Sequence, residues 1–143
     1  MKTPRRQARE DALKILFQFD WDTELSIETA LARFEVCFHQ SEKPVSEFAQ
    51  SLVRGVANKK VEIDESIRAI SNHWRPERMT AVDRNVLRLG AYELLFRDDI
   101  PSTVTINEMV ELARSYGTEN SPAFINGVLD KLKTLNPRPD KAP

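Results

Sequence analysis

The chain has 143 residues, of which 41% are hydrophobic and 30% are charged, and its formal net charge is -1. These values suit one globular domain with a substantial core. No run of eighteen apolar residues occurs and the basic N-terminus leads into an amphipathic pattern, so we expect a cytoplasmic protein without signal peptide or membrane span. The lone Cys37 cannot form an internal disulfide, and its place on an apolar helix face near Phe34 predicts a buried thiol.

The first predicted helix follows Pro4 and combines an apolar stripe with a basic start. Its apolar residues recur at helical spacing from Ala8 to Phe19. The first nine residues hold four basic side chains and no acid: Lys2, Arg5, Arg6 and Arg9. A local positive patch is enough to bind phosphate even when the net charge is near zero. A basic terminus that only aids solubility explains the charge equally well.

Two further helical stretches are predicted before the middle of the chain. Ser26 is placed to cap a helix over residues 27–38, and residues 41–44 interrupt the pattern with a proline. The apolar stripe over residues 45–74 is either one long helix that crosses Gly55 or two shorter helices.

After a break at Pro76, Thr80 is placed to cap the next helix, and residues 98–102 have the composition of a turn. Thr105 then fits a capping box for a helix that ends at a left-handed Gly117.

The last predicted helix starts at Ser121 and Pro122 and ends before the prolines of residues 136–139. Inside it lies the pair Asn126-Gly127, although glycine in a helix interior costs roughly 1 kcal/mol relative to alanine. Such a pair either lets another backbone pack closely or presents an uncluttered polar spot to a partner, and packing is the simpler explanation.

The sequence shows no strand alternation and no internal repeat. The predicted fold class is therefore all-α, a helical bundle of six or seven helices in two small antiparallel helical subdomains. We expect a single domain over residues 1–136, with halves of about 1–75 and 76–136, and a disordered tail over residues 137–143.

No catalytic, metal or cofactor site is predicted. His39 and His73 lack the ligand spacing of a zinc site. The four glycines are isolated from one another, so neither a P-loop nor a dinucleotide fingerprint occurs. Acidic residues at predicted turns and caps are explained by the electrostatics of helix ends.

Four segments in order carry a family resemblance. They are residues 5–10, residues 83–94, residues 106–113 and residues 124–131, and the last, which begins Phe-Ile-Asn-Gly, is the strongest. Together they resemble the NusB family of bacterial transcription antitermination factors over nearly the whole chain. Residues 23–60 match mainly in helical pattern.

The resemblance implies an all-helical protein of two small subdomains that is not an enzyme. Members of that family pair with NusE, a small-subunit ribosomal protein, and the pair binds the single-stranded boxA element of nascent RNA. The complex assembles with other Nus factors on RNA polymerase and supports processive transcription of ribosomal RNA operons. Members differ in self-association, so a homodimer is a further expectation when NusE is absent.

The resemblance also implies which residues contact RNA. The candidates are Arg5, Arg6, Arg9, Phe124, Asn126 and Gly127. Guanidinium groups can pair with phosphates or stack on bases, an exposed aromatic ring can stack on an unpaired base, and asparagine can both donate and accept hydrogen bonds. Gln7 stands where the family often has a third consecutive basic residue. For Phe124, a place in the helix core is an equal alternative.

The resemblance further implies that contact with the protein partner is made by the exposed side of the first helix and by the start of the fourth. The candidates there are Phe17, Trp21, Asp83, Arg84 and Arg88. Aromatic and arginine anchors beside a charged rim are typical of specific interfaces. The two aromatic residues could equally belong to the core, and Asp83 could merely cap a helix.

Two other classes of function stay open. One is a helical protein-binding scaffold that does not touch RNA, and the other is a stand-alone relative of the RNA-binding domain of ribosomal RNA cytosine methyltransferases.

Overall fold

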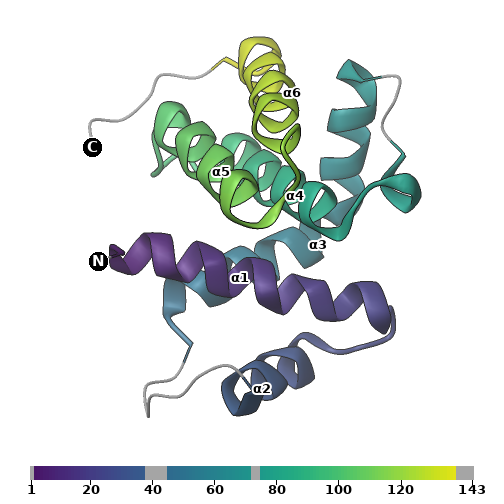
Figure 1. The fold of residues 1–143 in the computed structure, drawn as a ribbon, viewed down its shortest axis with the longest axis vertical. Helices are drawn as coiled ribbons and strands as arrows, with labels where there is room; N and C mark the ends of the chain where they lie inside the picture. The colour runs from purple at the N-terminus through teal and green to yellow at the C-terminus, as the bar shows by residue number, and fades with distance from the viewer. Residues whose placement is uncertain (1, 38–44, 72–74, 138–143) are drawn as a thin grey trace. The chain divides into compact units, whose positions relative to one another are not determined.

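The computed structural model describes residues 2–37, 45–71 and 75–137 (Figure 1). Over these residues it contains six α-helices, one short 3-10 helix and no strand, which confirms the predicted all-α fold. No helix in this part of the chain is long and apolar enough to cross a membrane. The elements are α1 (Pro4–Trp21), α2 (Ile27–Cys37), α3 (Glu47–Ile70), the 3-10 helix η1 (Pro76–Arg78), α4 (Ala81–Phe96), α5 (Ser102–Tyr116) and α6 (Ser121–Leu135).

Two compact units make up the chain, Met1–Asn58 and Lys59–Pro143. The division falls inside α3, which is one continuous helix through Gly55. The boundary expected from the sequence lies later in the chain, near residue 75. The difference has a physical cause, because Asp64 in the second part of α3 is paired with Arg88 of α4 and so belongs with the helices that follow.

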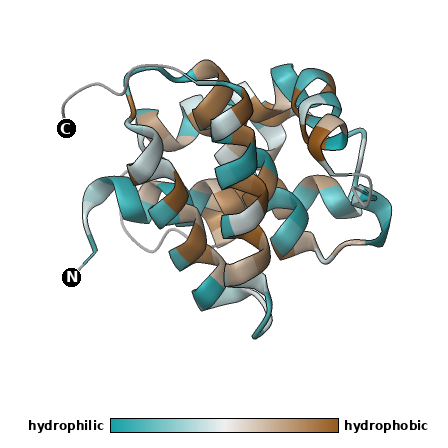
Figure 2. Cartoon of the chain, turned by 90° about the horizontal axis from the view of Figure 1, so that it is seen from above, coloured by the Kyte–Doolittle hydropathy of each residue, from teal (hydrophilic) through white to brown (hydrophobic). Residues whose placement is uncertain are grey.

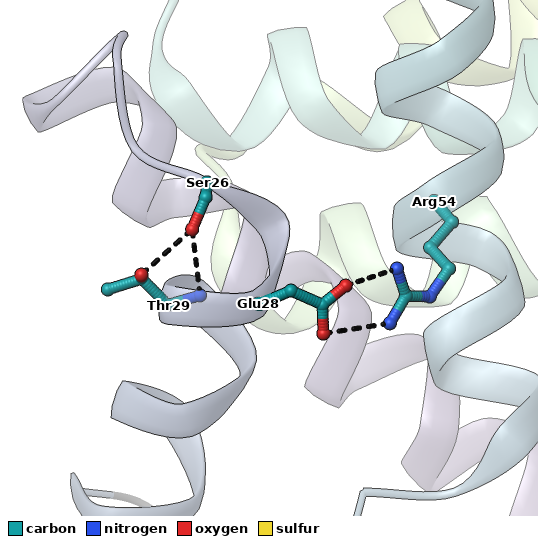
Figure 3. A network of polar contacts seen from close by, with 4 residues as sticks. All are labelled: Ser26, Glu28, Thr29 and Arg54. Atoms are coloured by element: carbon teal, nitrogen blue, oxygen red, sulfur yellow. Dashed lines mark hydrogen bonds and ion pairs between the residues drawn. The ribbon is translucent and has the colours of Figure 1, made fainter.

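The first unit is built from α1, α2 and the first part of α3. Ser26 caps α2 as predicted, since its Oγ accepts a hydrogen bond from the Thr29 N–H at 3.1 Å (Figure 3). In the first turn of α2, Glu28 joins α2 to α3, because Arg54 donates to both of its carboxylate oxygens at 2.7 and 3.2 Å (Figure 3). The core of this unit is apolar: Ala8, Ala12, Leu13, Ile15, Leu16, Ala30, Leu31, Phe34, Val45, Ala49, Leu52, Val53 and Val56.

The expectation of a buried Cys37 is wrong, because the residue is exposed. Cys37 is the last residue of α2, and the buried stripe of that helix ends one turn earlier at Phe34. The thiol therefore lies beyond the part of the helix that meets the core.

In the second unit, α4, α5 and α6 pack against one another in all three pairings. Hydrophobic and hydrophilic residues alternate along the helices, as amphipathic helices require (Figure 2). Gly90 of α4 lies where side chains of α5 and α6 pack against that helix. A Cβ there would lie 2.6 Å from a methyl carbon of Leu129 on α6 and 3.1 Å from Cγ of Met109 on α5. The absence of a side chain at this position is what permits the packing.

The predicted capping box at Thr105 is wrong, because α5 begins three residues earlier, at Ser102. Thr105 is fully buried inside the helix, and its hydroxyl donates to Oε1 of the buried Glu93 on α4 at 2.7 Å. The Thr105 hydroxyl, which the local sequence pattern predicted to cap a helix, thus forms a hydrogen bond to another helix instead.

The helix α5 ends at Tyr116 as predicted, but the left-handed stop is wrong, since Gly117 has φ -94° and ψ -165°. The backbone angles at Gly117 do not require a glycine, but the space around its Cα does. A Cβ would lie 2.5 Å from Oγ of Ser121 and 2.7 Å from the carbonyl oxygen of Ala113. After this tight connection α6 runs to Leu135, and residues 138–143 of the expected tail lie outside the described residues.

Candidate nucleic-acid and partner interfaces

The basic start of α1 is partly used inside the first unit. Lys2 forms an ion pair with the buried carboxylate of Glu10. Arg9 is only 2% exposed, and its guanidinium carbon lies 5.2 Å from the centroid of the Phe48 ring on α3. Arg5 and Arg6 are exposed. The burial of Arg9 runs against its predicted contact with RNA, because a ligand does not reach a side chain that the fold covers.

Arg5 has a defined position although it is exposed. Its guanidinium carbon lies 4.5 Å from the centroid of the same Phe48 ring, within the range of a cation-π contact. The neighbouring Gln7 is an uncharged amide, and its side chain donates to Asp11 at 3.0 Å. We call the exposed pair Arg5 and Arg6 the basic edge.

The predicted residues of α6 lie on the outer side of that helix. Its buried stripe consists of Ile125, Leu129 and Leu132, together with Ser121. Phe124 is 40% exposed, so the core alternative for this residue is wrong. Asn126 and Gly127 are exposed as well.

Gly127 faces open space. A Cβ at this position would meet no atom within 4 Å. The explanation by tight helix packing is therefore wrong for this glycine, and it holds instead for Gly90, which the sequence did not single out. What remains for Gly127 is the other alternative, an uncluttered spot on the surface.

A shallow hollow of about 250 Å³ lies beside Phe124 and Gly127. It is lined by Ile70 and Ser71 from the end of α3 and by Ala123, Phe124, Gly127, Val128 and Lys131 from α6. Lys131 follows Gly127 by one helical turn and brings a positive charge to a mostly apolar wall. Sequence reasoning missed Lys131 as a candidate, although its position four residues after Gly127 was a usable signal. We call Phe124, Asn126, Gly127 and Lys131 the α6 surface.

Aromatic candidates for a protein partner stand at the end of α1. Trp21 is 90% exposed, which excludes the core alternative for it. Phe17 is half-buried and lies one helical turn before Trp21, so the two rings share a side of the helix. A solvent-exposed tryptophan is a common anchor residue in protein interfaces.

Arginine candidates on α4 are engaged within the second unit. Arg88 is buried, and it donates from Nε and Nη2 to the two carboxylate oxygens of Asp64 at 3.0 Å each. Arg84 donates from Nη1 to the carbonyl oxygens of Pro76 at 2.6 Å and Met79 at 3.0 Å. Both side chains bind residues that precede α4 in the chain. The guanidinium group of Arg88 is buried, which runs against its predicted contact with a protein partner. The pairing role of Asp64 had no signal in the sequence beyond its place between two buried isoleucines.

Asp83 occupies the predicted place in the first turn of α4. Its N–H donates to Oγ1 of the capping Thr80 at 3.2 Å. One of its carboxylate oxygens, Oδ1, is buried and has no hydrogen-bond partner among the residues that the structure describes. A contact of Asp83 with a protein partner stays a prediction.

Side chains that could hold a metal do not gather in the described ranges, where no group of three or more His, Cys, Asp or Glu residues has the required geometry. His39 and His73 lie outside those ranges.

Comparisons with known proteins agree on one family. The sequence model of the NusB family matches residues 6–134. The transcription antitermination protein NusB of Anaeromyxobacter dehalogenans strain 2CP-1 is 51% identical over 132 residues, 92% of each chain. The solved structure of T. maritima NusB has a TM-score of 0.81 and 42% identity, covering 94% of this chain and 93% of that one. A chain from a crystal structure of antitermination factors NusB and NusE in complex with double-stranded RNA has a TM-score of 0.80 and 28% identity, covering 94% of this chain and 99% of that one. This chain belongs to the NusB family.

Proposed function

We propose that the protein is a transcription antitermination factor of the bacterial cytoplasm that pairs with NusE and binds boxA-type single-stranded RNA. The observation that carries the RNA part is the α6 surface, where the exposed ring of Phe124 lies beside the open space at Gly127. One structurally similar chain comes from a complex of NusB and NusE with double-stranded RNA, which supports both kinds of partner.

The α6 surface has the chemistry of a single-strand site. An exposed aromatic ring can stack on an unpaired base, and each such contact is worth about 1–3 kcal/mol. Asn126 can donate to and accept from the edge of a base, and the missing side chain at Gly127 lets a sugar or base approach the helix. Lys131 supplies a cation for the backbone that accompanies the base. A base paired in a duplex presents no free face to such a ring, so this surface favours single strands.

The basic edge supplies the second group of contacts. Arg5 and Arg6 are exposed, and guanidinium groups match phosphate oxygens in a bidentate way. Each phosphate neutralised on a single strand adds about 0.7 to the slope of log affinity against log salt. Two contacts therefore give a modest but measurable salt dependence.

The partner surface centres on Trp21 and Phe17, and we assign it to NusE. In the absence of NusE the same surface offers a contact to a second copy of the chain. Trp21→Ala should weaken NusE binding by about 2 kcal/mol or more, the loss typical of a central aromatic anchor. The thermal midpoint should change little, because the ring makes few contacts at 90% exposure. Unchanged NusE affinity in a pull-down or calorimetric titration removes Trp21 from the interface.

The RNA site is tested by comparing two truncations on the same helix. Phe124→Ala should lower the affinity for boxA-type RNA measured with NusE present, whereas Leu135→Ala, at 59% exposure, should leave it unchanged. Thermal midpoints of both variants should stay close to that of the wild type. Equal affinities of the two variants contradict the assignment, and a large loss of stability in Phe124→Ala contradicts the exposed position of the ring.

A further inference from the structure

The ring of Phe48 on α3 lies against two arginines of α1. The guanidinium carbons of Arg5 and Arg9 lie 4.5 and 5.2 Å from its centroid. The arginines are four residues apart and thus share one side of their helix. Arg9 is buried and Arg5 is exposed, so the ring extends from the edge of the core toward the surface.

Phe48 itself is half-buried and adjoins the apolar stripe of α3, in which Ala49 and Leu52 are fully buried. Packing against the apolar core therefore accounts for only part of the surface of the Phe48 ring. The same ring also contacts the charges of Arg5 and Arg9.

The geometry leaves the hydrogen-bonding capacity of Arg5 intact. A guanidinium group contacts an aromatic ring through its face, whereas its five N–H donors lie in its plane and point outward. Among the residues that the structure describes, no carbonyl or carboxylate accepts a hydrogen bond from the Arg5 side chain. The ring thus contacts the group, while none of the described oxygen atoms accepts a hydrogen bond from its donors.

We propose that Phe48 is a positioning residue for RNA binding, whose ring orients the Arg5 guanidinium so that its in-plane donors meet a phosphate. The inference rests on the proposed RNA binding and goes beyond it, because Phe48 itself need not touch RNA. A preoriented side chain loses less conformational freedom on binding, which raises affinity without any new contact.

A double-mutant cycle tests the inference on the full chain with NusE present. Phe48→Leu should lower the affinity for boxA-type RNA about two- to fivefold, which corresponds to the typical strength of an exposed cation-π contact. In an Arg5→Ala background the same change should have no effect, because the side chain through which it acts is gone. Phe48→Tyr keeps the aromatic face and should restore the wild-type affinity.

Each outcome of the cycle decides a separate point. Equal losses from Phe48→Leu in both backgrounds, or a Phe48→Tyr variant as weak as Phe48→Leu, overturn the positioning role. If Arg5→Ala leaves affinity unchanged while Phe124→Ala lowers it, the inference fails and the proposed function stands. If the wild type binds no RNA, both fail.

A spectroscopic measurement covers the case in which Phe48→Leu does not fold. The ring current of Phe48 should shift the Nε–Hε proton signal of Arg5 upfield from that of Arg6 in the wild type and in Phe48→Tyr. An Arg5 signal at the position of an ordinary exposed arginine contradicts the inference.

Discussion

Gly90 and Gly127 lie in neighbouring helices of the second unit and have opposite surroundings. A side chain at Gly90 would collide with Leu129 and Met109, whereas a side chain at Gly127 would meet nothing within 4 Å. Only Gly90 is therefore explained by the folded chain itself. The folded chain does not explain the cost of a glycine in the helix interior at Gly127, and we propose that a ligand needs the space.

Gly127→Ala should raise the free energy of unfolding by about 0.5–1 kcal/mol, because alanine restricts the unfolded chain and favours the helix. The same variant should bind boxA-type RNA more weakly, since the methyl group projects into the space that we assign to RNA. Gly90→Ala is the control, and crowding of the buried Leu129 should destabilise it by about 1–3 kcal/mol. Chemical denaturation and an RNA titration check both; full RNA affinity in Gly127→Ala would place this glycine outside the interface.

The ion pair of Arg88 and Asp64 gives a second test at the level of single residues. Arg88→Ala should destabilise the protein by about 3 kcal/mol, because it leaves a largely buried carboxylate without its partner. Replacing both residues by apolar ones, as in Arg88→Met with Asp64→Leu, should recover most of that loss. A variant Arg88→Ala of normal stability but weak NusE binding would support the original interface assignment instead.

Burial of individual side chains is the part of the site that periodicity could not predict. Arg5 and Arg9 occupy the same side of α1 and look alike in sequence, yet only the second is covered. Phe124 adjoins the buried Ile125 but lies outside the core. Such differences arise from which other helix lies opposite, and a helical repeat carries no information about that.

At the level of helices, local signals determined most boundaries. Thr80 and Ser26 cap α4 and α2 through hydrogen bonds that involve only neighbouring residues, so their sequence patterns were sufficient. The start of α5 was mispredicted because the Thr105 hydroxyl binds Glu93 on another helix. Local chemistry predicts a helix end wherever no distant group competes for the capping side chain.

The contact between α2 and α3 responds to pH. The hydrogen bonds and charge of Arg54 lower the pKa of the exposed Glu28 from its ordinary value of 4.5. A lowered folded pKa means that the pair stabilises the fold at pH values above 4.5, and that this contribution is lost as pH falls through the folded value. The thermal midpoint of the wild type should exceed that of Glu28→Gln slightly at neutral pH and low salt. The difference should shrink as pH falls below 4.5, and a difference that stays the same from neutral to acidic pH contradicts the role of this pair.

At the level of the whole molecule, the predicted fold class and family are confirmed. Helical periodicity and capping are local, so they predicted an all-helical chain. The border between units depends on long-range pairs such as Asp64 with Arg88, which no local pattern reveals. The net charge of -1 likewise gives no sign of the basic edge. A ligand responds to the local charge on the surface that it meets, and the net charge of the chain does not describe that local charge.

The central claim is that this chain binds boxA-type single-stranded RNA together with NusE. It is tested most directly by a binding titration of that RNA with and without NusE from the same source, repeated over a range of salt concentrations. A scrambled single strand and a boxA-containing duplex serve as control ligands.

We predict that NusE tightens binding, that the boxA-type single strand is preferred over both controls, and that affinity falls with salt. Replacing Arg5 and Arg6 by alanine should reduce the slope of log affinity against log salt by about 1.4. Equal affinity for all three RNAs, or no effect of NusE, would contradict the claim.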